Sequence, residues 1–187
     1  MKIIGIHGSP RPAGSSAQLL SAILKQCEEK GAQTQTYHLN TLSFKGCQAC
    51  YSCRQKGKEG VCIMKYDMNH ILEDILSADA VVLASPVYMW QMSAQAKLFT
   101  DRLMPLLKPD YSSRLSGQRL LVLYTQGQPD ISKFSLYFQY VNAMYSFLGF
   151  HTLDPFVAGG LRELDDLKNQ PETVVKAKQL AARLMES

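Results

Sequence analysis

The chain has 187 residues, of which 46% are hydrophobic and 19% charged, which is the balance of an ordinary globular domain rather than a disordered segment. That length is enough to bury one full core, so we expect a single domain over residues 1–187. The net charge is +4, but Lys and Arg are scattered and no basic run is interleaved with aromatic residues, which argues against nucleic-acid binding.

Two further absences in the sequence bear on location. No apolar run approaches the roughly 18 residues that a membrane-spanning helix requires. The N-terminus leads directly into a strand-like run, without the basic segment, apolar core and cleavage site of an export signal. We therefore expect a cytoplasmic protein with no membrane partner.

The first element is an apolar run over residues 2–6, which ends in a loop rich in Gly, Pro and Ser before a helix begins. Such a loop can hold a phosphate, because the helix end offers unpaired N–H groups and a partial positive charge. Ser9, Ser15 and Ser16 add hydroxyl donors, and Arg11 adds a forked cationic donor. The alternative is an ordinary strand–helix turn with capping residues, and the loop alone leaves both interpretations open.

This loop matches neither of two common phosphate-binding motifs. The Walker pattern needs a Gly-Lys pair, and no lysine lies between Ile3 and Leu24. The dinucleotide pattern G-x-G-x-x-G does not fit the spacing of Gly5, Gly8 and Gly14. What remains is a serine-rich loop with one arginine.

Helices and strands alternate along the rest of the chain. Apolar residues at helical spacing predict helices over 15–30, 67–76, 93–103, 132–148 and 171–185. Short apolar or β-prone runs predict strands over 33–39, 78–84, 118–124 and 150–157. The segment 40–65 lacks clear periodicity and contains four of the five cysteines, so we expect it to be an insertion in the domain.

This order predicts a parallel sheet with helices on both faces, since right-handed crossovers restrict the topology. Five strands fit a flavodoxin-like α/β three-layer sandwich with strand order 2-1-3-4-5. In such a sheet ligands bind beyond the carboxyl ends of the strands, near the switch between strands one and three. The loops over 9–16, 85–92 and 125–130 should therefore share one ligand.

The content of these loops indicates the kind of ligand. The second loop contains the only tryptophan, Trp90, beside Tyr88 and two methionines, which make good walls for a flat aromatic ligand. The third offers Gln126 and a close backbone approach at Gly127. A phosphate, a flat ring and polar contacts at the ring edge describe an aromatic mononucleotide, and FMN fits better than a nucleoside triphosphate.

The helix expected over 132–148 has apolar residues on more than one face. Phe134, Tyr137 and Phe138 lie one way, and Tyr140 and Phe147 lie another. A helix that is apolar nearly all round is buried on both sides. Both a subunit interface and deep packing within the monomer would explain this pattern.

Three motifs, taken together, carry a family resemblance. They are Gly8-Ser9-Pro10-Arg11 with Ser15-Ser16, then Ser85-Pro86-Val87-Tyr88, then Lys97 through Asp101-Arg102. In this order they resemble the NAD(P)H-dependent FMN reductase and flavodoxin-fold oxidoreductase family. The resemblance covers nearly the whole chain, through residues 157–160 and the last helix.

The resemblance implies an FMN-dependent oxidoreductase that takes hydride from NAD(P)H and passes electrons to a quinone, a flavin or another small acceptor. It also implies a homodimer or higher homo-oligomer, and it requires no catalytic side chain. The site residues would be Ser9, Arg11, Ser15 and Ser16 at the phosphate, Pro86, Val87, Tyr88, Met89 and Trp90 along the ribityl chain and ring, and Gln126 and Gly127 at the polar edge of the ring. Asp101 and Arg102 would form a structural pair at a helix end. The alternative is an electron-transfer protein with FMN, alone or with a [4Fe–4S] cluster, that has no NAD(P)H activity of its own.

Four cysteines, Cys47, Cys50, Cys53 and Cys62, are separated by two, two and eight residues. Followed by the run Tyr66-Asp67-Met68, they resemble the iron–sulfur flavoprotein branch. The gap of eight and the tyrosine at position 66, where an acidic residue is common, both depart from its pattern. The two short spacings put three thiolates within reach of one [4Fe–4S] cluster, which the fourth can close. The same thiols could instead bind zinc, be structural or be vestigial, so the cluster is one interpretation among several. A stable disulfide is not expected in a reducing cytosol.

Two other groups are assigned no role in chemistry. His7 lies in the first strand and is expected to be a packed core residue. Cys27 lies on the apolar face of the first helix, where a buried thiol is inert.

Overall fold

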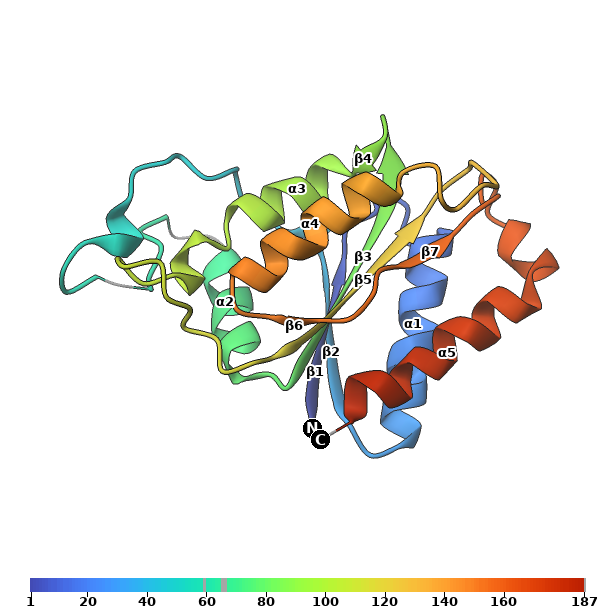
Figure 1. The fold of residues 1–187 in the computed structure, drawn as a ribbon, viewed down its shortest axis with the longest axis horizontal. Helices are drawn as coiled ribbons and strands as arrows, with labels where there is room; N and C mark the ends of the chain where they lie inside the picture. The colour runs from blue at the N-terminus through green and yellow to red at the C-terminus, as the bar shows by residue number, and fades with distance from the viewer. Residues whose placement is uncertain (59, 65–66, 187) are drawn as a thin grey trace.

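The protein is described here by a computed structural model, which covers residues 1–58, 60–64 and 67–186. Its centre is a parallel sheet (Figure 1). The strands lie in the order β2 (Gln33–His38), β1 (Lys2–His7), β3 (Ala80–Tyr88), β5 (Arg119–Thr125) and β6 (His151–Thr152). This confirms the predicted flavodoxin-like order, since β5 and β6 are the fourth and fifth parallel strands along the chain.

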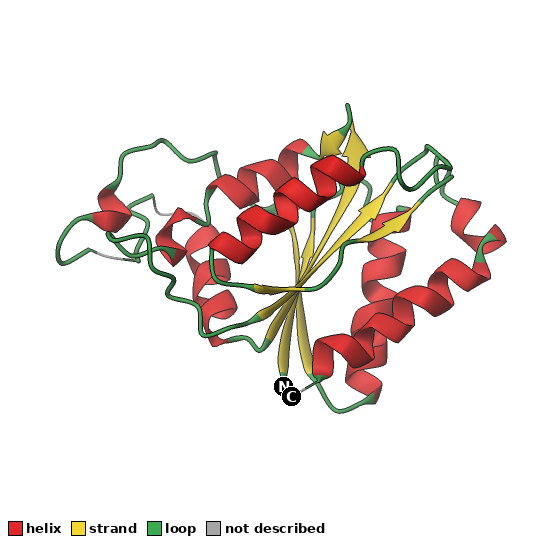
Figure 2. Ribbon diagram, viewed as in Figure 1, coloured by secondary structure: helices red, strands yellow, loops and turns green. Residues whose placement is uncertain are grey.

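Helices cover both faces of the sheet (Figures 1 and 2). One face carries α1 (Ser15–Glu29) and α5 (Pro171–Met185), and the other carries α2 (Met68–Ser77), α3 (Ala94–Asp101) and α4 (Ser135–Phe147). Short 3-10 turns are η1 (Leu39–Thr41), η2 (Ser52–Arg54), η3 (Met104–Leu106) and η4 (Asp166–Asn169). Within the described residues, no helix combines the length and the apolar character needed to cross a membrane.

Strand β1 contributes to both cores. Ile3 packs with α1 and α5, whereas Ile4 and Ile6 pack with the helices on the opposite face, because successive side chains of a strand alternate between faces. Gly5 lies on the α1 face, where an added Cβ would come within 2.7 Å of the Leu24 side chain. The absence of a side chain at Gly5 therefore lets α1 lie close to the sheet.

The sequence-based boundaries are wrong at two strands. The expected strand over 150–157 forms two short strands, β6 and β7 (Phe156–Ala158), which pair with different parts of β5. Leu153 still donates to the carbonyl of Leu120 (2.8 Å), but Pro155 has no N–H with which to continue the ladder. In turn, β3 continues through residues 85–88, which were expected to be a loop, and folds back into β4 (Gln91–Met92).

Residues 40–58 and 60–64 project from the sheet beyond the ends of α2 and α3 (Figure 1). Asp67 holds the N-cap position of α2, as expected from the sequence, but its carboxylate accepts the backbone N–H of Ser43 (2.9 Å). This contact ties the projecting segment to the start of α2. Tyr66, one of the two departures from the iron–sulfur flavoprotein pattern, lies outside the described residues.

His7 is a core residue, as predicted, and is only 1% exposed. Its Nδ1 atom lies 3.1 Å from Nδ1 of His38, and its Nε2 atom has no hydrogen-bond partner among the described residues. Burial, followed by the nearby His38, lowers the pKa of His7 from 6.5 to about 4. His7 is therefore neutral in the folded protein at physiological pH.

This lowered pKa predicts a pH-dependent loss of stability. Above pH 6.5 His7 is neutral in both the folded and the unfolded protein. As the pH falls from 6.5 to 4, His7 becomes protonated in the unfolded chain but stays neutral in the folded one. His7 then reduces the free energy of unfolding by up to about 1.4 kcal/mol per pH unit. The His7→Asn variant should lose this part of the slope in urea unfolding, whereas His70→Asn, at an exposed position, should keep it. Equal slopes for wild type and His7→Asn would contradict the assignment.

Candidate functional site

The loop after β1 is anchored to the end of β3 and the start of α3. The N–H of Gly8 donates to the carbonyl of Ala84 (2.8 Å), and the hydroxyl of Ser93, the N-cap of α3, donates to the carbonyl of Gly8. A Cβ at Gly8 would lie 3.1 Å from that Ala84 oxygen and 3.0 Å from Cβ of Ala96. Gly8 is therefore the point where three segments pack too closely for a side chain.

The predicted phosphate residues surround the N-terminus of α1. Its N-cap is Gly14, which has no side chain to satisfy the first N–H groups, and its first turn contains no acidic residue. Ser9 is buried and accepts the N–H of Arg11 (3.1 Å), while Ser15 is half-buried. Arg11 is exposed at the rim and donates to the carbonyl of Arg162 (3.1 Å). The end of α1 is thus open to an anion, with one arginine beside it.

Ser16 contacts the third loop rather than solvent. It is 2% exposed, and its hydroxyl lies 2.6 Å from the hydroxyl of Thr125 at the end of β5. Arg162 makes a second connection, since its Nε donates to the carbonyl of Gly127 (3.3 Å) and its own carbonyl accepts from Arg11. These contacts hold the loops after β1 and β5 side by side.

Gln126 is folded into its own loop. It is 2% exposed, and its amide nitrogen donates to the carbonyls of Gln128 (2.9 Å) and Asp130 (2.8 Å). Its Oε1 atom is buried without a hydrogen-bond partner among the described residues. The side chain therefore shapes the loop, and the predicted contact of Gln126 and Gly127 with a flavin ring remains a prediction.

The loop containing the only tryptophan is the tip of a β-hairpin. Tyr88 pairs with Gln91, and the two residues between them, Met89 and Trp90, have φ angles of 45° and 69°. Two-residue turns with both φ angles positive normally use Asn and Gly, because each left-handed residue with a side chain costs roughly 1–2 kcal/mol.

The hairpin nevertheless places large apolar side chains at its tip. Met89 is 94% exposed and Trp90 is 70% exposed, and the Trp90 ring lies 5.8 Å from the Phe134 ring. Pro86 is buried and Val87 is half-buried, so the exposed apolar side chains of this strand lie only near the tip of the hairpin. Strained, exposed aromatic residues at the carboxyl edge of a sheet are typical of a ligand-binding feature.

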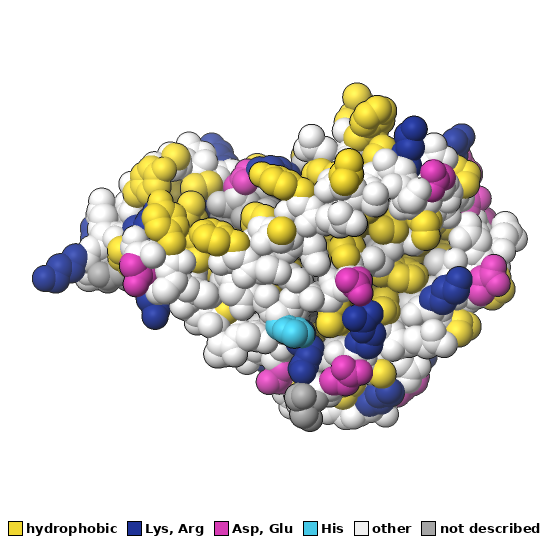
Figure 3. Space-filling model, in the orientation of Figure 1, with side chains coloured by type: hydrophobic (Ala, Val, Ile, Leu, Met, Phe, Trp, Pro, Cys, Tyr) yellow, Lys and Arg dark blue, Asp and Glu magenta, His cyan; other side chains and the backbone are white. Residues whose placement is uncertain are grey.

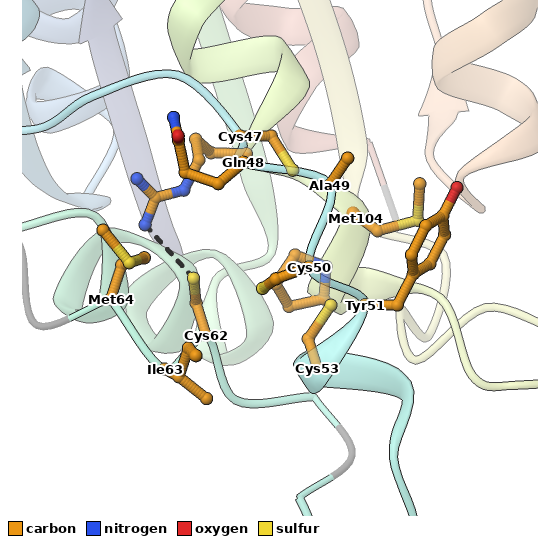
Figure 4. A pocket seen from close by; sticks show the side chains of 12 residues that line it. Cys47, Gln48, Ala49, Cys50, Tyr51, Cys53, Cys62, Ile63, Met64 and Met104 are labelled. Carbon is orange, nitrogen blue, oxygen red and sulfur yellow. Dashed lines mark hydrogen bonds between the residues drawn. The ribbon is translucent and has the colours of Figure 1, made fainter.

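The cysteine-containing segment forms a second candidate site (Figure 4). Cys47, Cys50, Cys53 and Cys62 all line one cavity of about 90 Å³. Cys47 and Cys50 are exposed, Cys53 is buried, and all are free thiols. Ala49 and Tyr51, on either side of Cys50, have φ angles of 51° and 55°, so the backbone turns sharply around the second cysteine.

The four thiols do not form a closed ligand set. Within the described residues, no group of three or more His, Cys, Asp or Glu side chains is arranged to hold one metal ion. Four thiolates around a common cavity are nevertheless the donors that tetrahedral zinc and a [4Fe–4S] cluster require. All four predicted ligands thus line one cavity, and their chemistry fits either zinc or a cluster.

The environment of these thiols differs from one to the next. Hydrogen bonds from the backbone and hydroxyl of Ser52 lower the pKa of Cys50. Burial, followed by the neighbouring Cys62, raises the pKa of Cys53. Arg102 lines the same cavity and donates to Sγ of Cys62 (3.3 Å).

Asp101 and Arg102 stand at the end of α3, as expected, but their side chains contact other residues. Asp101 pairs with Lys97 one helical turn earlier, and Arg102 turns toward the cysteines. Sequence reasoning also missed Ser93, Thr125 and Arg162. Ser93 could have been recognised as an N-cap before a helix, whereas Arg162 lies 151 residues from Arg11 and its sequence gives no signal of the contact.

A third feature is the outer face of α4. Phe138, Val141 and Tyr145 are buried on its inner side. Leu136 (81%), Tyr140 (77%) and Phe147 (60%) are exposed, so they are not packed within the described chain. Figure 3 shows hydrophobic side chains over this helix and at the hairpin tip. Deep packing within the monomer therefore does not account for this half of the helix.

The sheet order and the open helix end beside an apolar hairpin define a class, the flavodoxin-like α/β proteins that bind ligands at the carboxyl edge of the sheet. Residues 1–158 match the family model described as NADPH-dependent FMN reductase. The chain belongs to this family, as the motif resemblance predicted.

Curated relatives carry the name iron–sulfur flavoprotein. One from Archaeoglobus fulgidus is 34% identical over 131 residues, which is 70% of this chain and 58% of that protein. One from Methanocaldococcus jannaschii is 39% identical over 106 residues, 57% of this chain and 53% of that protein. The chain spans about half the length of these relatives.

Solved structures show the same fold at lower identity. An NAD(P)H:quinone oxidoreductase from Methanothermobacter marburgensis has a TM-score of 0.74 at 17% identity, with 97% of each chain covered. An FMN-dependent NADH-azoreductase from Bacillus anthracis, in complex with FMN, has a TM-score of 0.71 at 16% identity, with 100% of each chain covered. At these identities the likeness supports the fold alone.

Proposed function

We propose that the protein binds FMN at the carboxyl edge of the sheet and is an oxidoreductase that takes hydride from NAD(P)H. The observation that carries the proposal is the uncapped N-terminus of α1, with Arg11 at its rim and the apolar hairpin of β3 and β4 beside it. These two features match a ligand that carries an anionic phosphate at one end and a flat apolar ring at the other. FMN has both.

Each part of this site has a separate task. Ser9, Ser15 and Arg11 would hold the phosphate together with the first N–H groups of α1. Ser16 would act indirectly, because its hydrogen bond to Thr125 holds the neighbouring loop in place. These residues bind and orient the cofactor.

The hairpin and the third loop would surround the ring. Val87, Tyr88, Met89 and Trp90 would supply apolar surface that excludes water from one side of the ring, and buried Pro86 would support them from behind. Gln126 shapes the loop after β5 so that the backbone near Gly127 can approach the polar edge. When bound, FMN supplies the hydride and electron chemistry, so the site needs no side-chain acid or base. The acceptor would be a small molecule such as a quinone, a free flavin, or an azo or nitro compound.

We further propose that Cys47, Cys50, Cys53 and Cys62 hold a [4Fe–4S] cluster. This is supported by the convergence of all four thiols on one cavity and by relatives of 34% and 39% identity named iron–sulfur flavoproteins. If the cluster is present, the second candidate function is an electron-transfer protein that uses FMN and the cluster without NAD(P)H activity.

A second copy of the chain is the partner that we propose for the outer face of α4. The helix α4 carries the exposed residues Leu136, Tyr140 and Phe147 and also contacts the hairpin. That contact is made by Tyr137, whose hydroxyl accepts the N–H of Met92 (3.0 Å). An apolar face that continues into the flavin site would let the second copy cover part of the ring. A homodimer would then complete the site.

Phosphate recognition predicts a difference between FMN and riboflavin. Arg11→Gln should raise the dissociation constant for FMN about tenfold or more, because a hydrogen bond to a charged group contributes about 1.5–3 kcal/mol. Riboflavin, which has no phosphate, should bind wild type and variant equally in fluorescence titrations of the apoprotein. Arg183→Gln, on α5, is the matched control and should leave both affinities unchanged. Folded apoprotein that takes up no FMN would refute the proposal, and flavin that NADH and NADPH both fail to bleach would favour the electron-transfer function.

The cysteine proposal predicts metal content. Protein purified without oxygen should contain about four iron and four sulfide per chain. Cys53→Ala should lose both, whereas Cys27→Ala should keep them, because Cys27 is buried on α1 with its pKa raised to about 11. Zinc in place of iron, or no metal in the wild-type protein, would refute the cluster.

The dimer proposal predicts the mass in solution. Wild-type protein should sediment at twice the chain mass of 20.9 kDa. Tyr140→Lys should shift it toward the monomer, because it places a charge in the centre of an apolar interface. Val175→Lys, at a 54% exposed position on α5, should leave the dimer intact. A monomeric wild-type protein would contradict the proposal.

A further inference from the structure

A buried arginine lies beside the four cysteines. Arg102 follows α3 directly, and its backbone N–H donates to the carbonyl of Phe99 (3.0 Å), which ends the helix. Its side chain extends into the cavity that the cysteines line, yet the residue is only 2% exposed. Charged side chains are buried to this extent at a cost that needs compensation by an opposite charge or by hydrogen bonds.

The guanidinium contacts both ends of the cysteine-containing segment. Nη1 donates to the carbonyl of Lys45 (2.7 Å), two residues before Cys47. Nη2 donates to Sγ of Cys62 (3.3 Å), which is the dashed line that ends at Cys62 in Figure 4. One side chain at the end of α3 thus contacts the backbone shortly before the first cysteine and the sulfur of the last cysteine. The planar fork of arginine makes both contacts at once, which the single ammonium of a lysine does less well.

This placement has a consequence for any anionic group held by the thiols. A cluster bound by four thiolates carries negative charge, and that charge increases when the cluster is reduced. A fixed positive charge and a hydrogen bond to a ligating sulfur both stabilise the reduced form more than the oxidised form, and both are known determinants of cluster potentials. Arg102 supplies the two together from a buried position.

We propose that Arg102 is a positioning residue that holds Cys62 in place and raises the reduction potential of the cluster. The inference rests on the proposed [4Fe–4S] cluster. It concerns electron transfer to and from this protein, because a higher cluster potential makes the cluster a better acceptor of electrons from the flavin. A purely structural Arg102, which only ties Lys45 to α3, would leave the potential unchanged.

The test is an anaerobic redox titration of the holoprotein, followed by electron paramagnetic resonance of the reduced cluster. Arg102→Gln removes the charge and keeps a donor, and Arg102→Lys keeps the charge and loses the fork. For Arg102→Gln we expect the ratio of reduced to oxidised cluster at a fixed solution potential to fall about tenfold. For a one-electron couple this means that the reduction potential of the cluster becomes about 59 mV more negative. Arg102→Lys should lie between Arg102→Gln and wild type.

Lys56→Gln is the matched control, because Lys56 is an exposed cation of the same segment. An unchanged potential in Arg102→Gln, or an equal shift in Lys56→Gln, would overturn the inference. Arg102→Gln could lose the cluster altogether. In that case a normal iron content in Arg102→Lys supports the inference, whereas loss of iron from both variants, with normal FMN content, overturns it. Wild-type protein without iron and sulfide would refute the cluster itself, which separates that failure from the failure of Arg102 to act on it.

Discussion

The candidate site depends on parallel pairing of β1, β3 and β5. His7 pairs with Ala84, and Pro86 pairs with Thr125, so the three strands end at the same edge. Gly8 then packs against the end of β3 and the start of α3, where a larger residue would not fit. This close contact orients the first loop so that the N-terminus of α1 faces the edge where the hairpin and the third loop also lie.

The two proposed redox sites are linked by α3. Ser93 caps its N-terminus and binds the carbonyl of Gly8 beside the phosphate loop, while Arg102 follows its C-terminus and binds Cys62. One short helix therefore contacts both the proposed flavin site and the cysteine cavity. Rigid packing of α3 on the sheet, through buried Ala96 and Phe99, would hold the two sites at a constant separation.

Much of the fold followed from periodicity. The strand order was predictable because alternating helices and continuous apolar strands permit few topologies. The division of the last strand into β6 and β7 was not predictable. The effect of Pro155 on the ladder depends on its register against β5, which the sequence does not reveal. The hairpin was missed because Met and Trp are poor residues for a left-handed turn, and local propensity therefore predicted an open loop.

The site was predicted in its composition but not in its contacts. Serines and one arginine at a helix start predicted a phosphate loop, which stays a prediction, and the cysteine spacing predicted a group of thiols that the structure places around one cavity. The contacts of Ser16 with Thr125 and of Arg102 with Cys62 join residues far apart in sequence, 109 and 40 positions, so no local pattern reveals them. The exposed face of α4 was visible as apolar residues on a second face of the helix, but only coordinates show that its outer half is uncovered.

The central claim is that the phosphate of a flavin mononucleotide lies at the N-terminus of α1. Backbone amide shifts in a ¹H–¹⁵N spectrum of the apoprotein, followed during FMN addition, measure this most directly. Phosphate binding at this helix end predicts the largest shifts at residues 9–16, with smaller shifts at 88–90 and 126–127. Riboflavin, which has no phosphate, should leave residues 9–16 nearly unchanged. Shifts confined to the cysteine cavity, or equal effects of FMN and riboflavin at residues 9–16, would contradict it.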